Sequence, residues 1–204
     1  MKLTVALPKG RLGQTAWEYL FSPWAFPFDE RKLSVENESV RVLWVKPIDV
    51  IAYVKMGAAD IGITGLDSLQ ETGSNLYQLQ RLPFGHCKLV TARLKSETPT
   101  PLEKLKVATK YPNLANNYYQ SISQAIDIIP LQGSVELAPV IGLADVIVDI
   151  VETGSTLKAN GLQVDSEIME SQAMLVANHA RYRFHQKAIQ ALIKTRSNAY
   201  AKTD

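Results

Sequence analysis

Glu-Thr-Gly-Ser-Thr, at positions 152–156, directly follows the apolar run 146–151. A β-branched run of this length is typical of a strand buried on both faces of a parallel sheet. The N–H groups of a glycine turn that opens a helix bind anions, and Gly154 lets the chain approach a ligand closely. The turn therefore predicts a phosphate site. The alternative is an ordinary helix cap at Thr153 or Ser155.

Two carboxylates accompany this turn. Asp149 interrupts the apolar run, and Glu152 begins the turn itself. Acids beside a phosphate repel it unless they bind sugar hydroxyls or face a divalent cation. The combination predicts phosphate, ribose and Mg²⁺ together.

Two cations follow the first expected strand of the chain. The run 3–7 is stopped by Pro8, and Lys9, Gly10 and Arg11 come next. Strand, glycine turn, cations and helix is the order in which α/β folds bind anions at the carboxyl ends of their strands. Lys9 and Arg11 are therefore ligand candidates. The alternative is that they are solvated loop charges.

One stretch of the chain repeats the design around the phosphate turn. Gly-Ala-Ala-Asp-Ile-Gly-Ile at 57–63 matches Gly-Leu-Ala-Asp-Val-Ile-Val at 142–148. A Gly/Thr turn again follows the short strand, and Asp67 at the start of the next helix is placed to act. Two copies predict two lobes with the ligand between them.

The hydrophobic pattern predicts strands alternating with helices. Strands are expected at 3–7, 32–35, 40–45, after Asp60, and at 76–82, 87–92, 105–109, 126–131, 146–151 and 162–174. Helices are expected at 14–21, 47–55, 114–122, shortly after 133 with Ser134 as cap, and from 178 onward. The last helix is expected to turn Phe184, Ala188, Ile189, Leu192 and Ile193 inward.

Proline-rich segments suggest where the lobes meet. The polar stretch 95–101 contains two prolines and no apolar period, so we expect the chain to cross between 94 and 102. Lobe I is then 1–94 plus 175–204, and lobe II is 95–174. The aromatic, proline-rich segment 21–28 either covers the core or forms a partner surface, and core cover is the preferred interpretation.

Composition excludes several classes of protein. The chain has 204 residues, 46% of them hydrophobic, with a net charge of +2, which argues against a broad basic face for nucleic acid. Cys87 is the single cysteine, and no histidine stands at a zinc-ligand spacing from it. No signal peptide and no membrane-spanning run is visible, so the expected location is the cytoplasm.

Six stretches, in order and across essentially the whole chain, resemble the ATP phosphoribosyltransferase family. They are Leu-Pro-Lys-Gly-Arg-Leu at 7–12, Pro-Ile-Asp at 47–49 with Tyr53 and Val54, 57–67, Ala-Thr-Lys-Tyr-Pro-Asn at 108–113, Gly-Ser-Val-Glu at 133–136, and 145–162. Six ordered motifs are far more specific than one glycine turn. The resemblance implies that N1 of ATP attacks C1 of phosphoribosyl pyrophosphate (PRPP), with loss of pyrophosphate and a requirement for Mg²⁺. This reaction is the first step of histidine biosynthesis. The implied fold is α/β and two-lobed, like type II periplasmic binding proteins, with the ligand cleft between the lobes.

The resemblance also implies roles for individual residues. PRPP is expected on Asp149, Glu152, Thr153, Gly154, Ser155 and Thr156, with the 5-phosphate on the turn and ribose hydroxyls on Asp149 or Glu152. ATP is expected near Lys9, Gly10, Arg11, Lys46, Asp67, Lys110 and Tyr111, with Mg²⁺ held mainly by pyrophosphate facing Lys9 and Arg11. The expected catalytic residues are Lys9, Arg11, Glu136 and Asp149. Glu136 would accept the proton lost as N1 is alkylated, and no protein nucleophile is required.

The chain departs from the family pattern at two places. Lys46 stands where the family commonly has Arg, so a forked anion contact becomes a point charge. Ala-Asn-Asn at 115–117 replaces a segment that tends to be basic.

Regulation is expected to come from another chain. The lobes account for the sequence up to its last helix, so no C-terminal regulatory domain is expected, and the chain resembles the short form of the family. This form implies a dimer within a hetero-oligomer that contains a regulatory subunit resembling histidyl-tRNA synthetase. The competing class is a two-lobe small-anion binding or sensor module without catalysis, which an export signal or a helix-turn-helix segment would favour.

Overall fold

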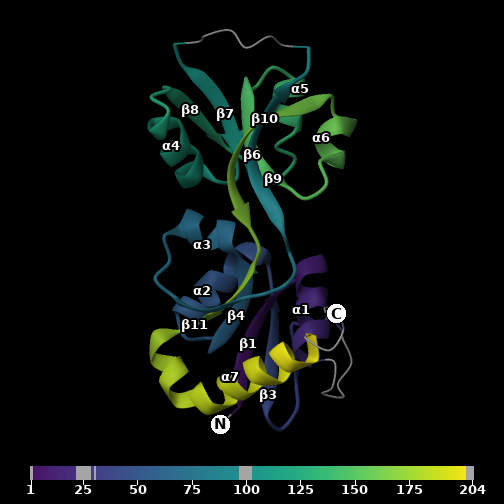
Figure 1. Ribbon diagram of the computed structural model, residues 1–204, viewed down its shortest axis with the longest axis vertical. Helices are drawn as coiled ribbons and strands as arrows, with labels where there is room; N and C mark the ends of the chain where they lie inside the picture. The colour runs from purple at the N-terminus through teal and green to yellow at the C-terminus, as the bar shows by residue number, and fades with distance from the viewer. Residues whose placement is uncertain (1, 22–28, 30, 97–102, 201–204) are drawn as a thin grey trace. The chain divides into compact units, whose positions relative to one another are not determined.

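The computed structural model describes residues 2–21, 29, 31–96 and 103–200, and they form two compact α/β units. Unit 1 comprises Met1–Leu69, Ser74–Gly85 and Ala173–Asp204, and unit 2 comprises Gln70–Gly73 and His86–Gln172. Each unit is built on its own sheet, with helices on the sheet faces (Figure 1). Most of the polar stretch 95–101 and of the aromatic segment 21–28 lies outside the described residues, so the expectation that 21–28 covers the core stays a prediction.

The sheet of unit 1 has the order β2-β3-β1-β4-β11-β5. Its strands are β1 (Leu3–Pro8), β2 (Ser34–Glu36), β3 (Val40–Val45), β4 (Ile61–Gly65), β5 (Tyr77–Arg81) and β11 (Ala173–Ala177). β1 runs parallel to both β3 and β4, so the carboxyl ends of these three strands meet at one edge. That edge is where the sequence places the first pair of cations.

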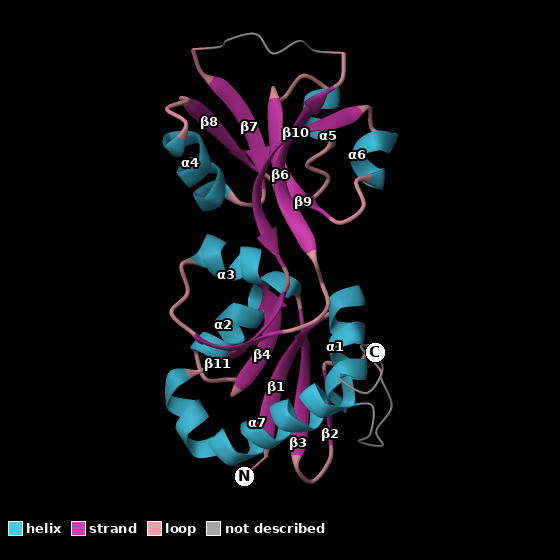
Figure 2. Cartoon of the chain, in the orientation of Figure 1, coloured by secondary structure: helices cyan, strands magenta, loops and turns pink. Residues whose placement is uncertain are grey.

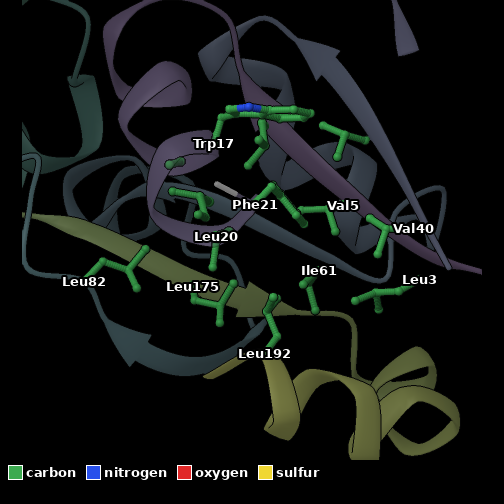
Figure 3. Packing of buried hydrophobic residues seen from close by; sticks show 14 of the residues in the cluster. Leu3, Val5, Trp17, Leu20, Phe21, Val40, Ile61, Leu82, Leu175 and Leu192 are labelled. Carbon is green, nitrogen blue, oxygen red and sulfur yellow. The ribbon is translucent and has the colours of Figure 1, made fainter. Parts of the chain in front are cut away.

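Helices cover both faces of this sheet. They are α1 (Arg11–Phe21), a 3₁₀ turn at Pro47–Asp49, α2 (Val50–Lys55), α3 (Leu66–Thr72) and α7 (His179–Tyr200). Trp17, Leu20 and Phe21 of α1 and Leu192 of α7 pack with Leu175 and other strand residues in one apolar cluster (Figure 3). α2 lies on the other face, where a Cβ on Gly62 would come within 3 Å of side-chain atoms of Val50 and Val54.

The inner face of α7 differs from its prediction. Phe184 is 76% exposed and Ala188 is also exposed, whereas Ile189 and Leu192 are buried as expected. The position one turn before Ile189 is taken by His185, whose Nε2 lies 3.6 Å from Oδ2 of buried Asp60. A hydrophobic period alone places Phe184 inward because it cannot recognise a buried histidine that has a carboxylate partner.

The sheet of unit 2 has the order β10-β6-β9-β7-β8. Its strands are β6 (Cys87–Leu94), β7 (Leu105–Thr109), β8 (Ile126–Pro130), β9 (Val146–Val151) and β10 (Leu162–Ser171). β7 is parallel to β8 and β9, and β6 pairs antiparallel with β9 and β10. The carboxyl ends of β8, β7 and β9 therefore share one edge.

Three helices cover the two faces of the unit 2 sheet. They are α4 (Pro112–Ser121), α5 (Leu137–Val140) and α6 (Ser155–Ala159). α4 packs on one face through Leu114, Ala115 and Tyr119, and α5 and α6 pack on the other through Ala138 and Leu157 (Figure 2). The first N–H groups of α4 are satisfied by Glu71, whose two carboxylate oxygens accept from the backbone N–H of Asn113 at 3.0 Å and of Leu114 at 2.9 Å.

In the repeat predicted from the sequence, an aspartate near the amino end of one strand bonds to the backbone of the neighbouring strand. Asp60 accepts from the N–H of Thr4 at 2.7 Å and returns a bond from its own N–H to the Thr4 carbonyl at 2.8 Å. Asp145 does the same with Lys106, at 2.8 and 2.9 Å. Each copy joins β4 to β1 or β9 to β7 at the edge opposite the candidate ligand groups.

The observed first crossing between units differs from the expected one. We expected it between 94 and 102, but the units divide at Gly85 and His86, and the return falls at Gln172 and Ala173 instead of 174 and 175. β6 belongs to unit 2 because it lies between β9 and β10 in that sheet. Antiparallel pairing at such long sequence separation leaves no local signal in β6 itself.

Candidate active site

The carboxyl edge of the unit 2 sheet gathers most of the predicted PRPP residues. β7 ends at Thr109 and is followed by Lys110 and Tyr111, β8 is followed by the turn that carries Glu136, and β9 carries Asp149. The turn 152–156 leaves the same edge. Since all three strands are parallel, residues far apart in sequence are brought to one place.

Asp149 is the buried charge of this edge. It is 5% exposed, and its Oδ1 accepts from the N–H of Ile150 at 2.9 Å. Nζ of Lys110 lies 3.7 Å from Oδ2. Burial raises the pKa of the Asp149 carboxyl above its ordinary value and nearby Glu136 adds to that rise, while Lys110 and the Ile150 N–H act in the opposite direction.

The turn after β9 opens α6 through a left-handed glycine. Gly154 has φ of 73° and precedes the first residue of α6, so a residue with a Cβ would be strained there. Thr153 Oγ1 and Ser155 Oγ lie 3.0 Å apart, and Thr153 Oγ1 accepts from the Ser155 N–H at 3.4 Å. Gly154, which directly precedes α6, has no side chain to cap the helix. Of the expected capping contacts, one long hydrogen bond from the first N–H of α6 to Thr153 is therefore present.

The segment before α5 has an unusual backbone at Ser134. Its φ is 49°, a left-handed value that is uncommon for a residue other than glycine. Ser134 was expected to cap the helix with its side chain, but the helix begins after Glu136, and the Ser134 carbonyl accepts from the Leu137 N–H at 3.1 Å. Val135 is fully buried next to it and anchors the half-buried Glu136.

The carboxyl edge of unit 1 gathers the other candidates. Lys9, Gly10 and Arg11 follow β1, Lys46 follows β3, and Asp67 lies in the first turn after β4. The backbone N–H of Lys9 bonds to the Val45 carbonyl at 2.8 Å, which holds the ends of β1 and β3 together. Arg11 and Lys46 are exposed and Lys9 is partly exposed, which fits both cations that meet a ligand and solvated loop charges.

Asp67 is less accessible than its prediction requires. It is 5% exposed, and Ser68 Oγ donates to its Oδ2 at 3.1 Å. A Cβ added to Gly65 would lie 2.2 Å from Asp67 Oδ1, so the carboxylate folds back over the glycine of its own turn. This packing gives Gly65 a structural role that the sequence pattern did not separate from ligand binding.

Sequence reasoning did not single out Thr109. Its side chain is fully buried at the end of β7, where Oγ1 donates to the Val148 carbonyl at 2.6 Å and accepts from the Tyr111 N–H at 2.8 Å. The sequence held two signals for it, namely its position directly before Lys110 at a strand end and its place in the motif 108–113. Within residues 2–21, 29, 31–96 and 103–200 there is no group of three or more His, Cys, Asp or Glu placed to hold a metal ion. None of the helices described is long and apolar enough to span a membrane.

The sequence is similar to one enzyme family over most of its length. A model of the ATP phosphoribosyltransferase family matches residues 46–197. The ATP phosphoribosyltransferase of Clostridioides difficile (strain 630) is 45% identical over 198 residues, covering 94% of this chain and 95% of that protein. The enzyme of the same name from Sulfurimonas denitrificans is 47% identical over 184 residues, covering 88% of each.

Solved structures show the same relationship and the breadth of the fold. The ATP phosphoribosyl transferase (HisG:HisZ) complex from Thermotoga maritima includes a chain that matches with a TM-score of 0.86 and 36% identity, over 96% of this chain and 97% of that one. The alkanesulfonate-binding protein SsuA from Xanthomonas axonopodis pv. citri matches with a TM-score of 0.66 at 13% identity, over 97% of this chain and 72% of that one. The second likeness shows the fold alone and confirms the expected binding-protein-like architecture.

Proposed function

Because the chain belongs to the ATP phosphoribosyltransferase family, we propose that the carboxyl edge of the unit 2 sheet is its PRPP site. The enzyme transfers the phosphoribosyl group of PRPP to N1 of ATP and releases pyrophosphate, the first step of histidine biosynthesis. One observation carries the site assignment. The left-handed glycine turn of 152–156 leaves the same strand that carries buried Asp149 beside Lys110. The alternative of an anion-binding module without catalysis is not favoured by these relatives.

The parts of PRPP fit different groups of this edge. Backbone N–H groups and hydroxyls of Thr153, Gly154, Ser155 and Thr156 would bind the 5-phosphate. Asp149 would accept hydrogen bonds from ribose hydroxyls, with exposed Glu152 beside it. In this arrangement Asp149 and Glu152 face ribose hydroxyls, so they do not repel the phosphate.

The reaction asks for orientation and charge stabilisation. The bond from C1 of the ribose to the pyrophosphate oxygen breaks as N1 of ATP bonds to C1, through an oxocarbenium-like state, so no protein nucleophile is needed. Glu136 would accept the proton lost as N1 is alkylated. The remaining proposed contacts to ATP and to the departing pyrophosphate are Lys9, Gly10, Arg11, Lys46, Lys110 and Tyr111. Asp67 is not among them, because it is 5% exposed and its carboxylate folds back over Gly65.

The expected Mg²⁺ would bind together with PRPP and not at a site formed by the protein alone. The described residues offer carboxylates singly or in pairs, and a cation bound to phosphates needs only one or two from the protein. We propose that Mg²⁺ is held mainly by pyrophosphate, where it offsets the charge of the leaving group. The biosynthetic role and the single cysteine favour the cytoplasm as the site of action.

The likeness to the Thermotoga maritima complex supports a partner for this chain. We propose that the chain works as a dimer within a hetero-oligomer, together with a regulatory subunit that resembles histidyl-tRNA synthetase. Contacts with nucleic acid or membrane form no part of the proposal.

The site is tested by removing two hydroxyls from the turn. Thr153→Ala with Thr156→Ala is expected to weaken PRPP binding by about 1–3 kcal/mol for each charge-assisted bond lost, with the fold unchanged. Titration calorimetry measures the affinity. Ser121→Ala is the control, because its hydroxyl bonds to the Tyr118 carbonyl at the far end of α4. An unchanged PRPP affinity in the double variant would place the phosphate elsewhere.

A further inference from the structure

Thr109 connects two segments of the proposed PRPP site through one hydroxyl. It is fully buried at the end of β7. The hydroxyl donates to the Val148 carbonyl at 2.6 Å and accepts from the Tyr111 N–H at 2.8 Å. Both functions of the hydroxyl are thus used by backbone groups, one on β9 and one on the turn that follows β7.

The residues next to these two bonds form the ion pair of the site. Asp149 directly follows Val148, and Lys110 stands between Thr109 and Tyr111. Nζ of Lys110 lies 3.7 Å from Oδ2 of Asp149. The Thr109 hydroxyl therefore fixes the backbone on both sides of this pair at the same time.

We propose that Thr109 is a positioning residue for PRPP binding, because its hydroxyl ties the turn that carries Lys110 to the strand that carries Asp149. This inference rests on the proposed function, in which ionised Asp149 accepts hydrogen bonds from the ribose. In this proposal Thr109 holds Lys110 and Asp149 near each other and need not touch the substrate itself.

The pair needs such support because its two members differ in freedom. The Asp149 side chain is 7% exposed, whereas that of Lys110 is 37% exposed and has four rotatable bonds. At 3.7 Å the pair is an electrostatic contact that a small displacement of the turn would weaken. The charged groups that face Asp149 are Lys110, from the turn after β7, and Glu136, from the segment before α5. If Lys110 moves away, burial and Glu136 remain and favour the neutral acid.

The experiment compares Thr109→Val, which lacks the hydroxyl at nearly constant volume, with Thr109→Ser, which keeps it. If Thr109→Val does not fold, Thr109→Cys replaces it, since a thiol is a weak hydrogen-bond donor. Thr91→Val is the matched control. Thr91 is a buried threonine of the same sheet that pairs with Val148 from β6, and its hydroxyl accepts from the Ser166 N–H of β10 at 3.1 Å, so it makes no bond to the turn after β7 in the described contacts. PRPP dissociation constants are measured by calorimetry at pH 6 and pH 8 for these variants and for Asp149→Asn.

The expected result is a change in pH dependence. Protonation of Asp149 weakens binding, so the ratio of the dissociation constant at pH 6 to that at pH 8 should rise by about threefold or more in Thr109→Val. Thr109→Ser and Thr91→Val should keep the wild-type ratio. Titration of the PRPP phosphates contributes equally to every variant and cancels in the comparison.

The outcomes separate this inference from the site assignment. Wild-type affinity in Asp149→Asn would overturn the proposed role of Asp149 itself. Weak binding by Asp149→Asn with a wild-type ratio in Thr109→Val would leave the site standing and overturn the role of Thr109. A ratio raised equally in Thr109→Val and Thr109→Ser, or in Thr91→Val, would also overturn it, because the hydroxyl would then not be the cause.

Discussion

Burial of the Asp149 carboxylate lowers the stability of the fold when the group is ionised, whereas its proposed role in binding ribose needs the ionised form. Burial raises the pKa of its carboxyl, only partly offset by Lys110 and the Ile150 N–H. Between the ordinary and the raised pKa, the folded chain holds a proton that the unfolded chain has lost, so the stability contributed by this group falls as pH rises. Above that range the ionised carboxylate costs the fold free energy, and the proposed bond to ribose would account for a carboxylate at this position.

Replacing Asp149 by Asn should therefore separate the two effects. We expect PRPP affinity to fall by about 10- to 100-fold, as for loss of hydrogen bonds to a charged group. The melting temperature at pH 7.5 should stay the same or rise, by about 2–4 °C for each kcal/mol recovered. Calorimetry and thermal unfolding measure the two quantities.

Asp127→Asn is the control for this substitution. Asp127 lies on β8 of the same unit, where its side chain is 57% exposed and pairs with Lys104. It should change neither quantity, since exposed ion pairs contribute little. A melting temperature several degrees lower in Asp149→Asn, with unchanged PRPP affinity, would show that the carboxylate is structural.

At the scale of elements, the contact between β1 and α1 places the Lys9–Arg11 turn. Gly13 lies in the first turn of α1, and a Cβ there would be 1.6 Å from the Pro8 carbonyl oxygen. Backbone cannot give way as a flexible side chain can. α1 sits this close to the end of β1 because residue 13 has no side chain.

Gly13→Ala should force α1 away from β1. We expect a loss of about 3 kcal/mol or more in the free energy of unfolding, among the largest effects of a single substitution. The control is Gly133→Ala, where a Cβ would meet nothing within 4 Å and which should stay within about 0.5 kcal/mol. Urea unfolding measures both, and equal stability of the two variants would contradict the packing argument.

The sequence predicted elements well wherever the signal is local. β7 and β9 begin and end at the expected residues, because charged residues bound each strand at both ends. Two elements were less predictable for physical reasons. The inner face of α7 includes His185, which is buried because Asp60 lies near it, and α5 begins after a left-handed Ser134 that no propensity signals.

The candidate site was predictable in its parts but not in its assembly. Residues 149–156 and Lys9–Arg11 carry a recognisable strand and glycine pattern. Thr109 lies in the motif 108–113, but that motif does not show the bond from its hydroxyl to the carbonyl of Val148, 39 residues away in the chain. The burial of Asp67 over Gly65 depends on side-chain packing, which spacing does not show.

At the scale of the whole molecule, the two units share one strand arrangement but carry different residues at the carboxyl ends of their strands. Asp60 and Asp145 join neighbouring strands near their amino ends, where each carboxylate accepts from a backbone N–H of the next strand. The turns at the carboxyl ends differ between the units. Unit 1 presents cations there, and unit 2 presents a glycine turn with acids. This difference between the units fits the proposed reaction between two anionic substrates, in which each unit would bind one of them.

The last prediction concerns the chain and its proposed regulatory partner. The likeness to a chain of the Thermotoga maritima complex, with a TM-score of 0.86 over 97% of that chain, supports activity that depends on a second subunit. We expect low turnover of ATP and PRPP by the purified chain, higher turnover with the regulatory subunit, and inhibition by histidine only when both are present. Allosteric coupling of this kind is typically 5- to 150-fold.

The assay follows the N1-phosphoribosyl product by absorbance and mass in three mixtures: the chain alone, the chain with its partner, and both with histidine. A fourth mixture pairs the partner with the Asp149→Asn chain, which should show little turnover at limiting PRPP if the partner supplies no catalysis. Allosteric inhibition requires that histidine bind more tightly to a less active arrangement of the complex than to the active one. Full activity of the chain alone, inhibited by histidine without any partner, would place both the catalytic and the sensing function in this chain.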